Sequence, residues 1–210
     1  MLYFKLLGME INLNCDLGEK SKHHSNENDP ELLKIVNSAN VACGYHAGDE
    51  QTMQEIVKIS KENNVSIGAH PSFKDPENFG RKRMDLSASE ITKLVTDQYE
   101  ILQNIASLQG EKVSHIKPHG ALNNMACEDL ELATTLAKTI YHIDKDIIYL
   151  VPTGSKMEIA AKKLNMKIAC EIFADRNYED DGTLVSRTKD HALITDPNQA
   201  KNHVLNMVKN

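Results

Sequence analysis

Short apolar runs alternate with amphipathic segments along this 210-residue chain, and this alternation restricts the fold more than any other feature. The runs lack the period-two pattern of a strand with one solvated face, so we expect strands that are buried on both faces. The six predicted strands cover residues 10–15, 40–43, 65–69, 114–117, 147–151 and 167–171. Strands alternating with helices predict a parallel α/β sheet with right-handed crossovers, either open and doubly wound or a closed or nearly closed barrel.

Helix start signals stand between these runs. Asp29-Pro30 opens a helix whose apolar positions continue to Ala39, and Asp49 caps the next helix. A capping box, Ser87-Ala88-Ser89-Glu90, opens a long third helix. Further helices are expected over residues 131–140, 156–164 and 197 to about 207. Residues 71–86 form a long polar loop, a feature typical of lids.

Composition and length predict one cytoplasmic domain over residues 1–210. The 40% hydrophobic and 26% charged fractions are those of ordinary globular proteins. A net charge of −6 without a basic stripe argues against a nucleic-acid partner, and no run is long enough to span a membrane. The first eight residues are expected to be a tail, or an upstream start before Met9, because they are too short for a secretory leader.

Four cysteines occur without a CxxC pair, so we expect buried free thiols; a nucleophilic Cys15 or Cys43 is the alternative. The other two are Cys127 and Cys170.

Polar motifs stand at the ends of four apolar runs. Asp16 and Glu19 follow the first, and His46, His70 and His119 follow the next three, each beside Gly, Ala or Pro. The carboxyl ends of parallel strands meet at one edge of a sheet, where ligands bind. We therefore expect these side chains to converge on one site.

The chemistry of this site has several candidates. Asp16, His46 and His70 could ligate zinc, iron or manganese, or the histidines could shuttle protons. Helix capping by the carboxylates and structural histidines are the alternatives. Lys117 stands two residues before His119, on the same side of an extended chain. It could hold a carboxylate, a phosphate or a developing oxyanion, or pair with a neighbouring carboxylate.

Two sets of residues summarise these expectations. The predicted catalytic residues are Asp16, His46, His70, Lys117 and His119. The predicted substrate-binding residues are Glu19, Asp49, Arg81, Glu171, Asp175 and Arg176. Asp175 and Arg176 either form an ion pair that shapes their loop or bind an acidic substrate, a role for which Arg81 and Arg83 compete. The chain has neither a Gly-rich phosphate loop nor a GxSxG elbow.

Taken together, these motifs resemble the LamB/YcsF family, the A subunit of bacterial ATP-dependent 5-oxoprolinase. The matching stretches are residues 13–19, 39–49, 68–72 with Phe79-Gly80-Arg81, 113–122 and 171–187. The resemblance implies a seven-stranded (β/α) barrel of the polysaccharide deacetylase and glycoside hydrolase type. This chain stops at residues 207–210, where the family continues through a further strand with a Val-His-Gly-Asp-like motif. The last unit is therefore expected to be missing.

The resemblance also implies an activity, the ATP-dependent hydrolytic opening of 5-oxo-L-proline to L-glutamate in a complex with B and C subunits. ATP is then a co-substrate. The resemblance leaves open which subunit binds it, and the absence of a phosphate loop in the sequence argues against a self-sufficient ATP site in this chain. In our hypothesis Asp16 or a nearby histidine activates water, Lys117 stabilises negative charge and His119 protonates the ring nitrogen. An arginine holds the substrate carboxylate.

Two other functions remain open. One is a metal-dependent amidohydrolase or deacetylase that acts alone on an N-acyl substrate. The other is a truncated, non-catalytic family member that binds the B and C subunits or further copies of itself through an exposed sheet edge.

Overall fold

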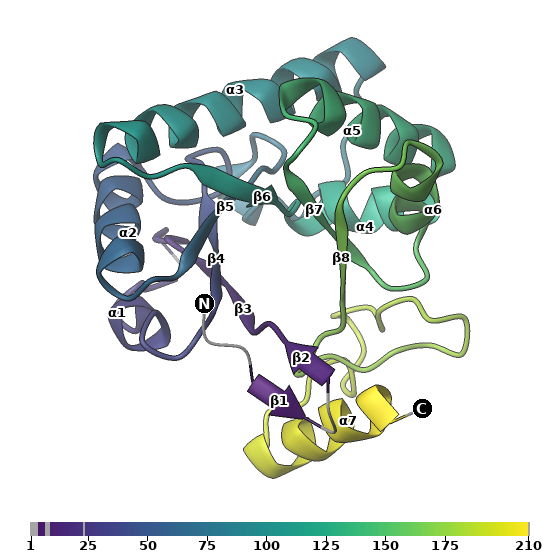
Figure 1. Cartoon of the computed structure of the whole chain (residues 1–210). Coiled ribbons are helices and arrows are strands. Elements are labelled where there is room, and N and C mark those ends of the chain that lie inside the picture. Colours follow the sequence, from purple (N-terminus) through teal and green to yellow (C-terminus); the bar gives the residue numbers. More distant parts are fainter. Residues whose placement is uncertain (1–3, 7–8, 23, 210) are drawn as a thin grey trace.

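The computed structural model describes residues 4–6, 9–22 and 24–209, and a curled parallel sheet forms its centre (Figure 1). Its six strands are Asn14–Leu17 (β3), Ser38–Ala42 (β4), Ser66–His70 (β5), Val113–Ile116 (β6), Ile148–Pro152 (β7) and Ile168–Glu171 (β8). Their order in the sheet is β3-β4-β5-β6-β7-β8. A doubly wound sheet reverses its strand order at a switch point, whereas sequential order is that of a (β/α) barrel. The sequence left these two folds open, and the structure selects the barrel type.

The barrel is not closed within the described part of the chain. β3 and β8 are the two edges of the sheet, and no ladder joins them to each other. The fold is therefore a curled half-barrel with helices outside it, in agreement with the expectation of a family barrel that lacks a unit.

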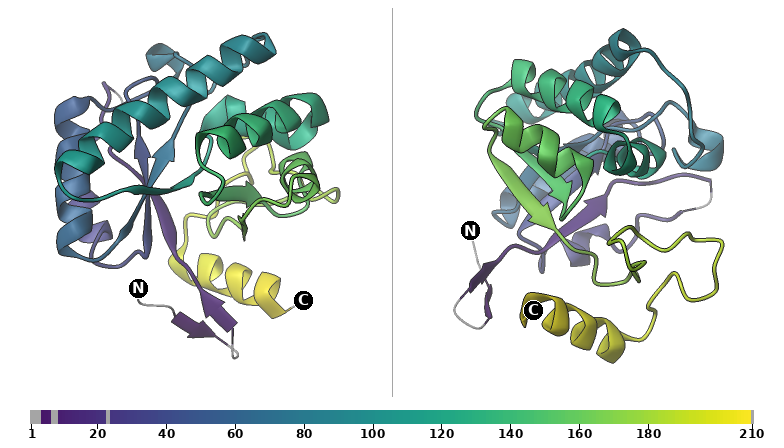
Figure 2. Two further views of the ribbon diagram at one scale, coloured as in Figure 1. Left: turned by 45° about the horizontal axis from the view of Figure 1, so that its top comes forward. Right: turned by 90° about the vertical axis from the view of Figure 1, so that its right-hand side faces the viewer.

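The larger helices cover the outer side of the curled sheet (Figures 1 and 2). They are Glu50–Glu62 (α2), Ala88–Leu108 (α3), Leu130–Ile143 (α5) and Lys156–Lys163 (α6). Two predicted helix starts are confirmed: the Asp49 side chain accepts from the Thr52 amide at 2.7 Å, and Ser87 and Glu90 form the expected capping box. Such caps satisfy amide groups that the helix itself leaves unpaired.

The first predicted strand divides into two. Met9–Ile11 (β2) pairs antiparallel with Phe4–Leu6 (β1), and β3 begins only at Asn14. The reason lies at Leu13, whose amide and carbonyl groups both bond to Asn37 at the start of β4. Residues 4–6 of the predicted tail thus form one strand of the β1–β2 pair. The remaining residues of that tail, 1–3 and 7–8, lie outside the described part of the chain.

The helix predicted from Asp29 to Ala39 is also wrong in length. Asp29–Leu32 (α1) makes barely one turn, and Ala39 is a fully buried residue of β4. Asn28, rather than Asp29, occupies the N-cap position. The Asp29 carboxylate instead accepts a 2.8 Å hydrogen bond from the amide of Gly18, which ties α1 to the loop after β3.

Three further elements complete the fold. Gly120–Glu128 (α4) was not predicted, because it starts at a glycine with φ of 56° and has no side-chain cap. Pro76–Asn78 (η1) is a 3-10 turn inside the predicted lid loop. Pro197–Lys209 (α7) begins at the predicted Asp196-Pro197 signal but has no buried residue.

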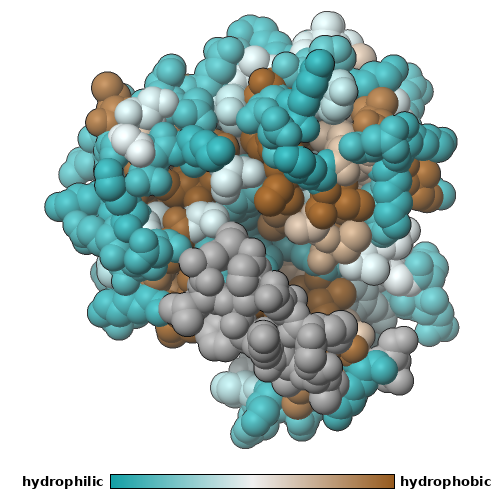
Figure 3. All heavy atoms as spheres, viewed as in Figure 1, coloured by the Kyte–Doolittle hydropathy of each residue, from teal (hydrophilic) through white to brown (hydrophobic). Residues whose placement is uncertain are grey.

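Burial is greatest between the sheet and the outer helices. The largest fully buried side chains there include Tyr149, Phe73, Leu102, Ile116 and Met157. In the view of Figure 3 the rim is mostly hydrophilic, and apolar side chains gather toward the middle of the face. None of the helices in the described ranges is both long and apolar enough to cross a membrane.

Candidate active site

A pocket of about 600 Å³ opens at the carboxyl ends of the strands. Five residues predicted from the strand-end motifs line it: Asp16, Glu19, His70, Lys117 and His119. His46 is fully buried behind them and stacks on His119, with ring centroids 3.9 Å apart. The structure therefore brings these strand-end motifs together at one site, as the sequence predicted.

Lys117 joins the two edge strands across the inside of the half-barrel. Its Nζ lies 3.0 Å from Asp16 Oδ1 on β3 and 3.2 Å from Glu171 Oε2 on β8. Burial disfavours the ammonium ion, but the two carboxylates outweigh it and raise the pKa of Lys117 above its usual value. Burial raises the pKa of Glu171, and Lys117 offsets only part of that rise. Lys117 is therefore a fixed, buried positive charge at the pocket wall.

Asp16 stays ionised in this setting. Burial alone would raise its pKa, but the charges of His70 and Lys117 hold that pKa well below the usual range. Asn40 on β4 donates to the same carboxylate at 2.9 Å, and its own oxygen lies 3.0 Å from His115 Nε2. Asn40 was missed by the sequence analysis, although a polar residue inside an apolar run was the available signal.

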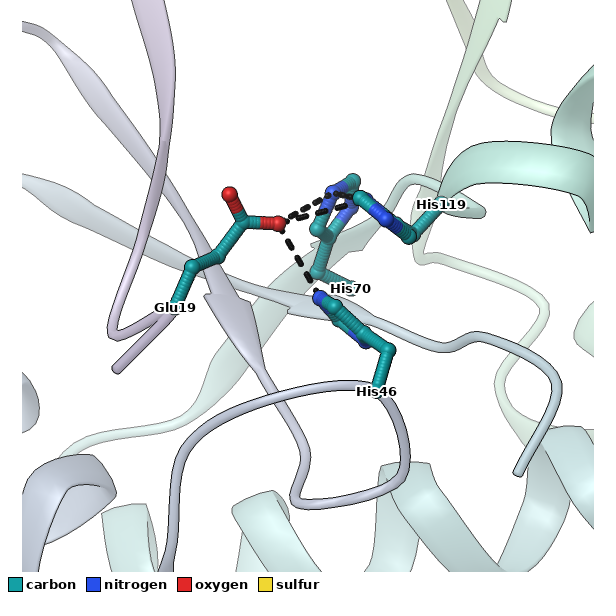
Figure 4. A group of neighbouring side chains, drawn as sticks. All are labelled: Glu19, His46, His70 and His119. Carbon is teal, nitrogen blue, oxygen red and sulfur yellow. Dashed lines mark hydrogen bonds and ion pairs between the residues drawn. The ribbon is translucent and has the colours of Figure 1, made fainter. Parts of the chain in front are cut away.

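Glu19 and three histidines form a compact cluster beside this charge bridge (Figure 4). Glu19 Oε1 lies 3.0 Å from His46 Nε2, 3.2 Å from His119 Nδ1 and 3.8 Å from His70 Nε2. All four of these atoms lie within 4.8 Å of one another. The sequence predicted Asp16, His46 and His70 as metal ligands. Asp16 Oδ2 lies 3.4 Å from His70 Nε2, and Glu19 lies near all three histidines.

Backbone carbonyls orient two of the three rings. His70 Nδ1 lies 2.6 Å from the Lys117 carbonyl oxygen, and His119 Nε2 lies 3.0 Å from that of Phe79. A carbonyl only accepts hydrogen bonds, so each of these nitrogens carries its hydrogen. Phe79 itself has φ of 56°, a strained value for a residue with a side chain, and such strain is concentrated at functional sites.

The charge states of the rings differ. Burial, reinforced by the charge of His70, lowers the pKa of His46 to about 3 and that of His119 well below its usual value. Burial also opposes a charge on His70, but the Asp16 carboxylate outweighs it and raises the pKa of His70. His119 is therefore neutral with both nitrogens facing protein atoms, and this geometry does not favour it as the proton donor to a leaving nitrogen.

The predicted lid loop packs onto the histidines. Gly80 has φ of +64°, and a Cβ there would lie 2.1 Å from Ser72 Oγ and 2.9 Å from His46 Cβ. The Phe79 ring meets those of His46 and His119 edge to face at 5.4 and 5.3 Å. Only glycine at position 80 allows this close approach, so the loop forms part of the site's wall.

Four arginines line the remaining wall of the pocket: Arg81, Arg83, Arg176 and Arg187. Burial, and then the charge of Arg187, lowers the pKa of both Arg81 and Arg176. Arg83 is occupied by Glu128 at 3.0 Å. Arg187 was not singled out from the sequence, although it ends the polar stretch that follows β8. This wall suits an anionic ligand.

Three predicted substrate-binding residues, Asp49, Glu171 and Asp175, are not among the residues that line the pocket. Glu171 is buried and paired with Lys117. Asp49 is an exposed helix cap, and Asp175 is exposed on the loop after β8. Arg176 does not form the alternative ion pair with Asp175 either. Its guanidinium donates instead to the carbonyls of Val185 and Ala192. Arg176 thus holds its own loop in shape.

The cysteines offer no activated nucleophile. Burial raises the pKa values of Cys15 and Cys43 to about 12, so the nucleophilic alternative is not supported. Cys43 is buried as predicted, whereas Cys170 is exposed and corrects the expectation of burial.

Several proteins of known name are similar to this chain in sequence. The chain is 44% identical over 201 residues to proteins named as the A subunit of 5-oxoprolinase, from Staphylococcus aureus strains bovine RF122 / ET3-1 and Newman. In each case the match covers 96% of this chain and 80% of the relative.

A solved structure has the same fold. The crystal structure of a lactam utilization protein from Thermus thermophilus superposes with a TM-score of 0.88 at 36% identity. The match covers 95% of this chain and 81% of that protein. The family model described as LamB/YcsF family matches residues 11–210. The chain therefore belongs to the LamB/YcsF family.

Proposed function

We propose that this chain is the A subunit of an ATP-dependent 5-oxoprolinase, which opens 5-oxo-L-proline to L-glutamate together with B and C subunits. The observation that carries the proposal is the buried Lys117 bridge beside an arginine-lined pocket, in a chain so similar to proteins named as the A subunit of 5-oxoprolinase.

The pocket matches the charge pattern of this substrate. 5-Oxoproline has one carboxylate and one neutral lactam. Arg81 and Arg187 offer guanidinium groups at the pocket mouth, which suit bidentate binding of a carboxylate. The Lys117 ammonium is aligned by two carboxylates before the substrate arrives, so it can stabilise the negative charge that develops on the lactam oxygen.

The energy for ring opening comes from ATP. An unstrained lactam resists hydrolysis, and transfer of the γ-phosphoryl group to its oxygen makes the carbon electrophilic and releases ADP. Water then adds to that carbon, and the carbon–nitrogen bond breaks as the ring nitrogen takes a proton, which leaves an acyl phosphate. A second water hydrolyses the acyl phosphate to glutamate and phosphate. Asp16, held ionised by Lys117 and His70, positions the water in this scheme. Because the chain has no phosphate-binding loop, we assign the ATP site to a partner subunit.

One observation favours a second function. Glu19 and the three histidines have the composition of a hydrolytic metal site, which supports a metal-dependent amidohydrolase that acts without ATP.

Reconstitution separates these functions. The chain is mixed with purified B and C subunits, 5-oxoproline and ATP, and glutamate and phosphate are measured together. We expect equal release of the two products, dependent on every component. Glutamate release without ATP would instead establish the amidohydrolase. Binding of B and C without any release, while a longer A subunit is active in the same mixture, would make this chain a non-catalytic member.

A further inference from the structure

We propose that Glu19, His46, His70 and His119 bind one divalent transition-metal ion, with zinc as the best match. The proposal rests on the geometry of these four side chains and not on the identity of the substrate. It replaces the ligand set expected from the sequence, in which Asp16 stood in the place of Glu19.

The first argument is the meeting of unshared electron pairs. His70 Nδ1 and His119 Nε2 each donate to a backbone carbonyl, which leaves His70 Nε2 and His119 Nδ1 without hydrogens in the neutral rings. These two bare nitrogens lie only 3.0 Å apart, and Glu19 Oε1 lies 3.2 Å from the second. Three acceptors that face one another require a positive occupant, either a proton or a metal ion.

The second argument is spacing. Zinc bonds of about 2.0–2.1 Å to nitrogen and oxygen place tetrahedral ligand atoms about 3.3 Å apart. Glu19 Oε1 lies 3.0, 3.2 and 3.8 Å from its three histidine nitrogens. The four atoms all lie within 4.8 Å of one another, so shifts of up to about an ångström and a tilt of the stacked His46 and His119 rings bring them around one ion.

The third argument is the support of the ligands. His46, His70 and His119 are 0%, 1% and 6% exposed, so packing fixes their rings. Hydrogen bonds from the distal nitrogens of His70 and His119 to carbonyls are the usual outer support of metal-bound imidazoles. His46 Nδ1 is buried without a hydrogen-bond partner among the described residues. His46 Nδ1 can therefore take the ring hydrogen when Nε2 changes from a donor to Glu19 into a ligand.

The donor set also selects the metal. Three imidazole nitrogens and one carboxylate oxygen suit zinc, iron or manganese, whereas magnesium and calcium prefer all-oxygen sites. The ammonium of Lys117 and the amide of Asn40 occupy Asp16 Oδ1, and its Oδ2 lies 3.4 Å from His70 Nε2 but outside the group of four ligand atoms. Its negative charge nevertheless adds to that of Glu19 in favouring a divalent cation. A metal ion here would act as a Lewis acid toward groups in the adjacent pocket.

Metal binding by the purified full chain tests the proposal without any partner subunit. The protein is stripped with a chelator and titrated with Zn²⁺ by calorimetry, and bound metal is counted by mass spectrometry after dialysis. Co²⁺ then serves as a probe, since tetrahedral coordination gives intense visible absorption. We expect one ion per chain and a tetrahedral cobalt spectrum.

Variants identify the ligands. His119→Ala and the isosteric Glu19→Gln should each weaken Zn²⁺ binding by at least about a hundredfold. His24→Ala is the matched control, because His24 stacks on Phe79 at 4.2 Å but lies outside the ligand set, and its affinity should not change. Glu19→Gln preserves shape, so it keeps the test valid if His119→Ala does not fold.

Two results would overturn the proposal. One is a stoichiometry far below one ion per chain; the other is equal Zn²⁺ affinity in Glu19→Gln and the wild-type chain. In either case a proton, not a metal, holds the cluster together. The readout is metal and not glutamate, so this failure is distinct from failure of the proposed function.

Discussion

The central strands and the edge strands of the sheet hold their functional residues in different ways. β4 is buried at every position and β5 at four of five, whereas β3 and β8 each have one buried position. His70 is the last residue of β5, and His46 and His119 follow β4 and β6, but Asp16 and Glu171 stand on the edge strands. Packing therefore fixes the histidines, while the edge carboxylates depend on Lys117 for their positions.

This contrast continues beyond β8. The segment after β8 carries Arg176 and Arg187 to the pocket, yet α7 at its end has no buried residue and lies at the periphery (Figure 2). Arg176 and Arg187 are thus attached to the less packed region of the molecule, whereas Arg81 and Arg83 lie on the loop after β5 that packs onto the histidines. We conclude that the histidine cluster is built into the barrel, and that part of the arginine-lined wall is added at its edge.

The largest effect should follow from Lys117→Met, which removes the link between the two edges. Coupled glutamate release should fall by about a hundredfold to a thousandfold, because a preorganised charge at the reacting oxygen is lost. The variant should also be less stable by about 3–5 kcal/mol, since the buried Glu171 and the half-buried Asp16 lose their partner. Single-turnover assays and urea unfolding measure the two effects.

Exposed Lys156→Met is the control for Lys117→Met, since Lys156 is outside the pocket. A folded Lys117→Met protein with near wild-type turnover would show that the bridge is structural only.

Thiol labelling compares the central and the edge strands of the sheet without any mutation. At pH 8, iodoacetamide should modify exposed Cys170 on β8 at least about a hundred times faster than buried Cys43 after β4. A pKa of about 12 leaves about one Cys43 in 10⁴ as thiolate at that pH, and labelling should accelerate as the pH rises. Burial also raises the pKa of Cys170, so its contrast with Cys43 comes mainly from access.

Mass spectrometry of peptides during labelling gives both rates, and the same assay in urea should make them equal. Equal rates in the folded protein would mean that the central strands open as readily as the edge.

Glycine-to-alanine substitutions provide a third comparison of the centre and the edge of the sheet. Gly68 on β5 pairs with His115 on β6, and a Cβ at Gly68 would lie 2.1 Å from the His115 ring. Since Asn40 and Ser114 bond that ring, Gly68→Ala should destabilise the protein by about 2–3 kcal/mol.

Gly182→Ala is the matched change in the segment after β8. Gly182 has φ of +83°, and a Cβ added there would have no atom within 4 Å. Only the left-handed backbone conformation should then lower the free energy of unfolding, by about 1 kcal/mol. Urea unfolding measures both free energies, and a larger loss in Gly182→Ala would reverse the proposed order of the two regions.

The features that the sequence predicted correctly are those with local causes. The caps at Asp49 and Ser87 need only residues within one helical turn, and both formed. The convergence of Asp16, His70 and His119 followed from strand ends alone, because every parallel strand delivers its last residues to one edge. The missed helix α4 has no local cap to announce it.

The partner of the histidines could not be predicted, because it depends on how one loop turns. Asp16 and Glu19 are three residues apart, and spacing alone favours neither. Gly18, with φ of +71°, turns the chain between them. Asp16 consequently faces Lys117 from the strand, while Glu19 reaches the histidines from the loop. Arg187 was missed for a similar reason, since its approach to Arg81 is fixed by the folding of the segment after β8.

The smallest effect should follow from Tyr178→Phe, which changes the segment after β8 and leaves the barrel unchanged. The Tyr178 hydroxyl accepts a 2.8 Å hydrogen bond from the Phe173 amide and so anchors the segment that begins after β8. Loss of this hydrogen bond should weaken substrate binding by about 1 kcal/mol, which corresponds to about a fivefold rise in KM for 5-oxoproline. Because the contacts of Lys117 with Asp16 and Glu171 involve no atom of Tyr178, kcat should stay within about twofold. Steady-state kinetics separates the two constants, and Tyr141→Phe on α5 is the control. A fall in kcat with unchanged KM would mean that the segment after β8 positions the reacting groups, so that edge and centre act as one unit.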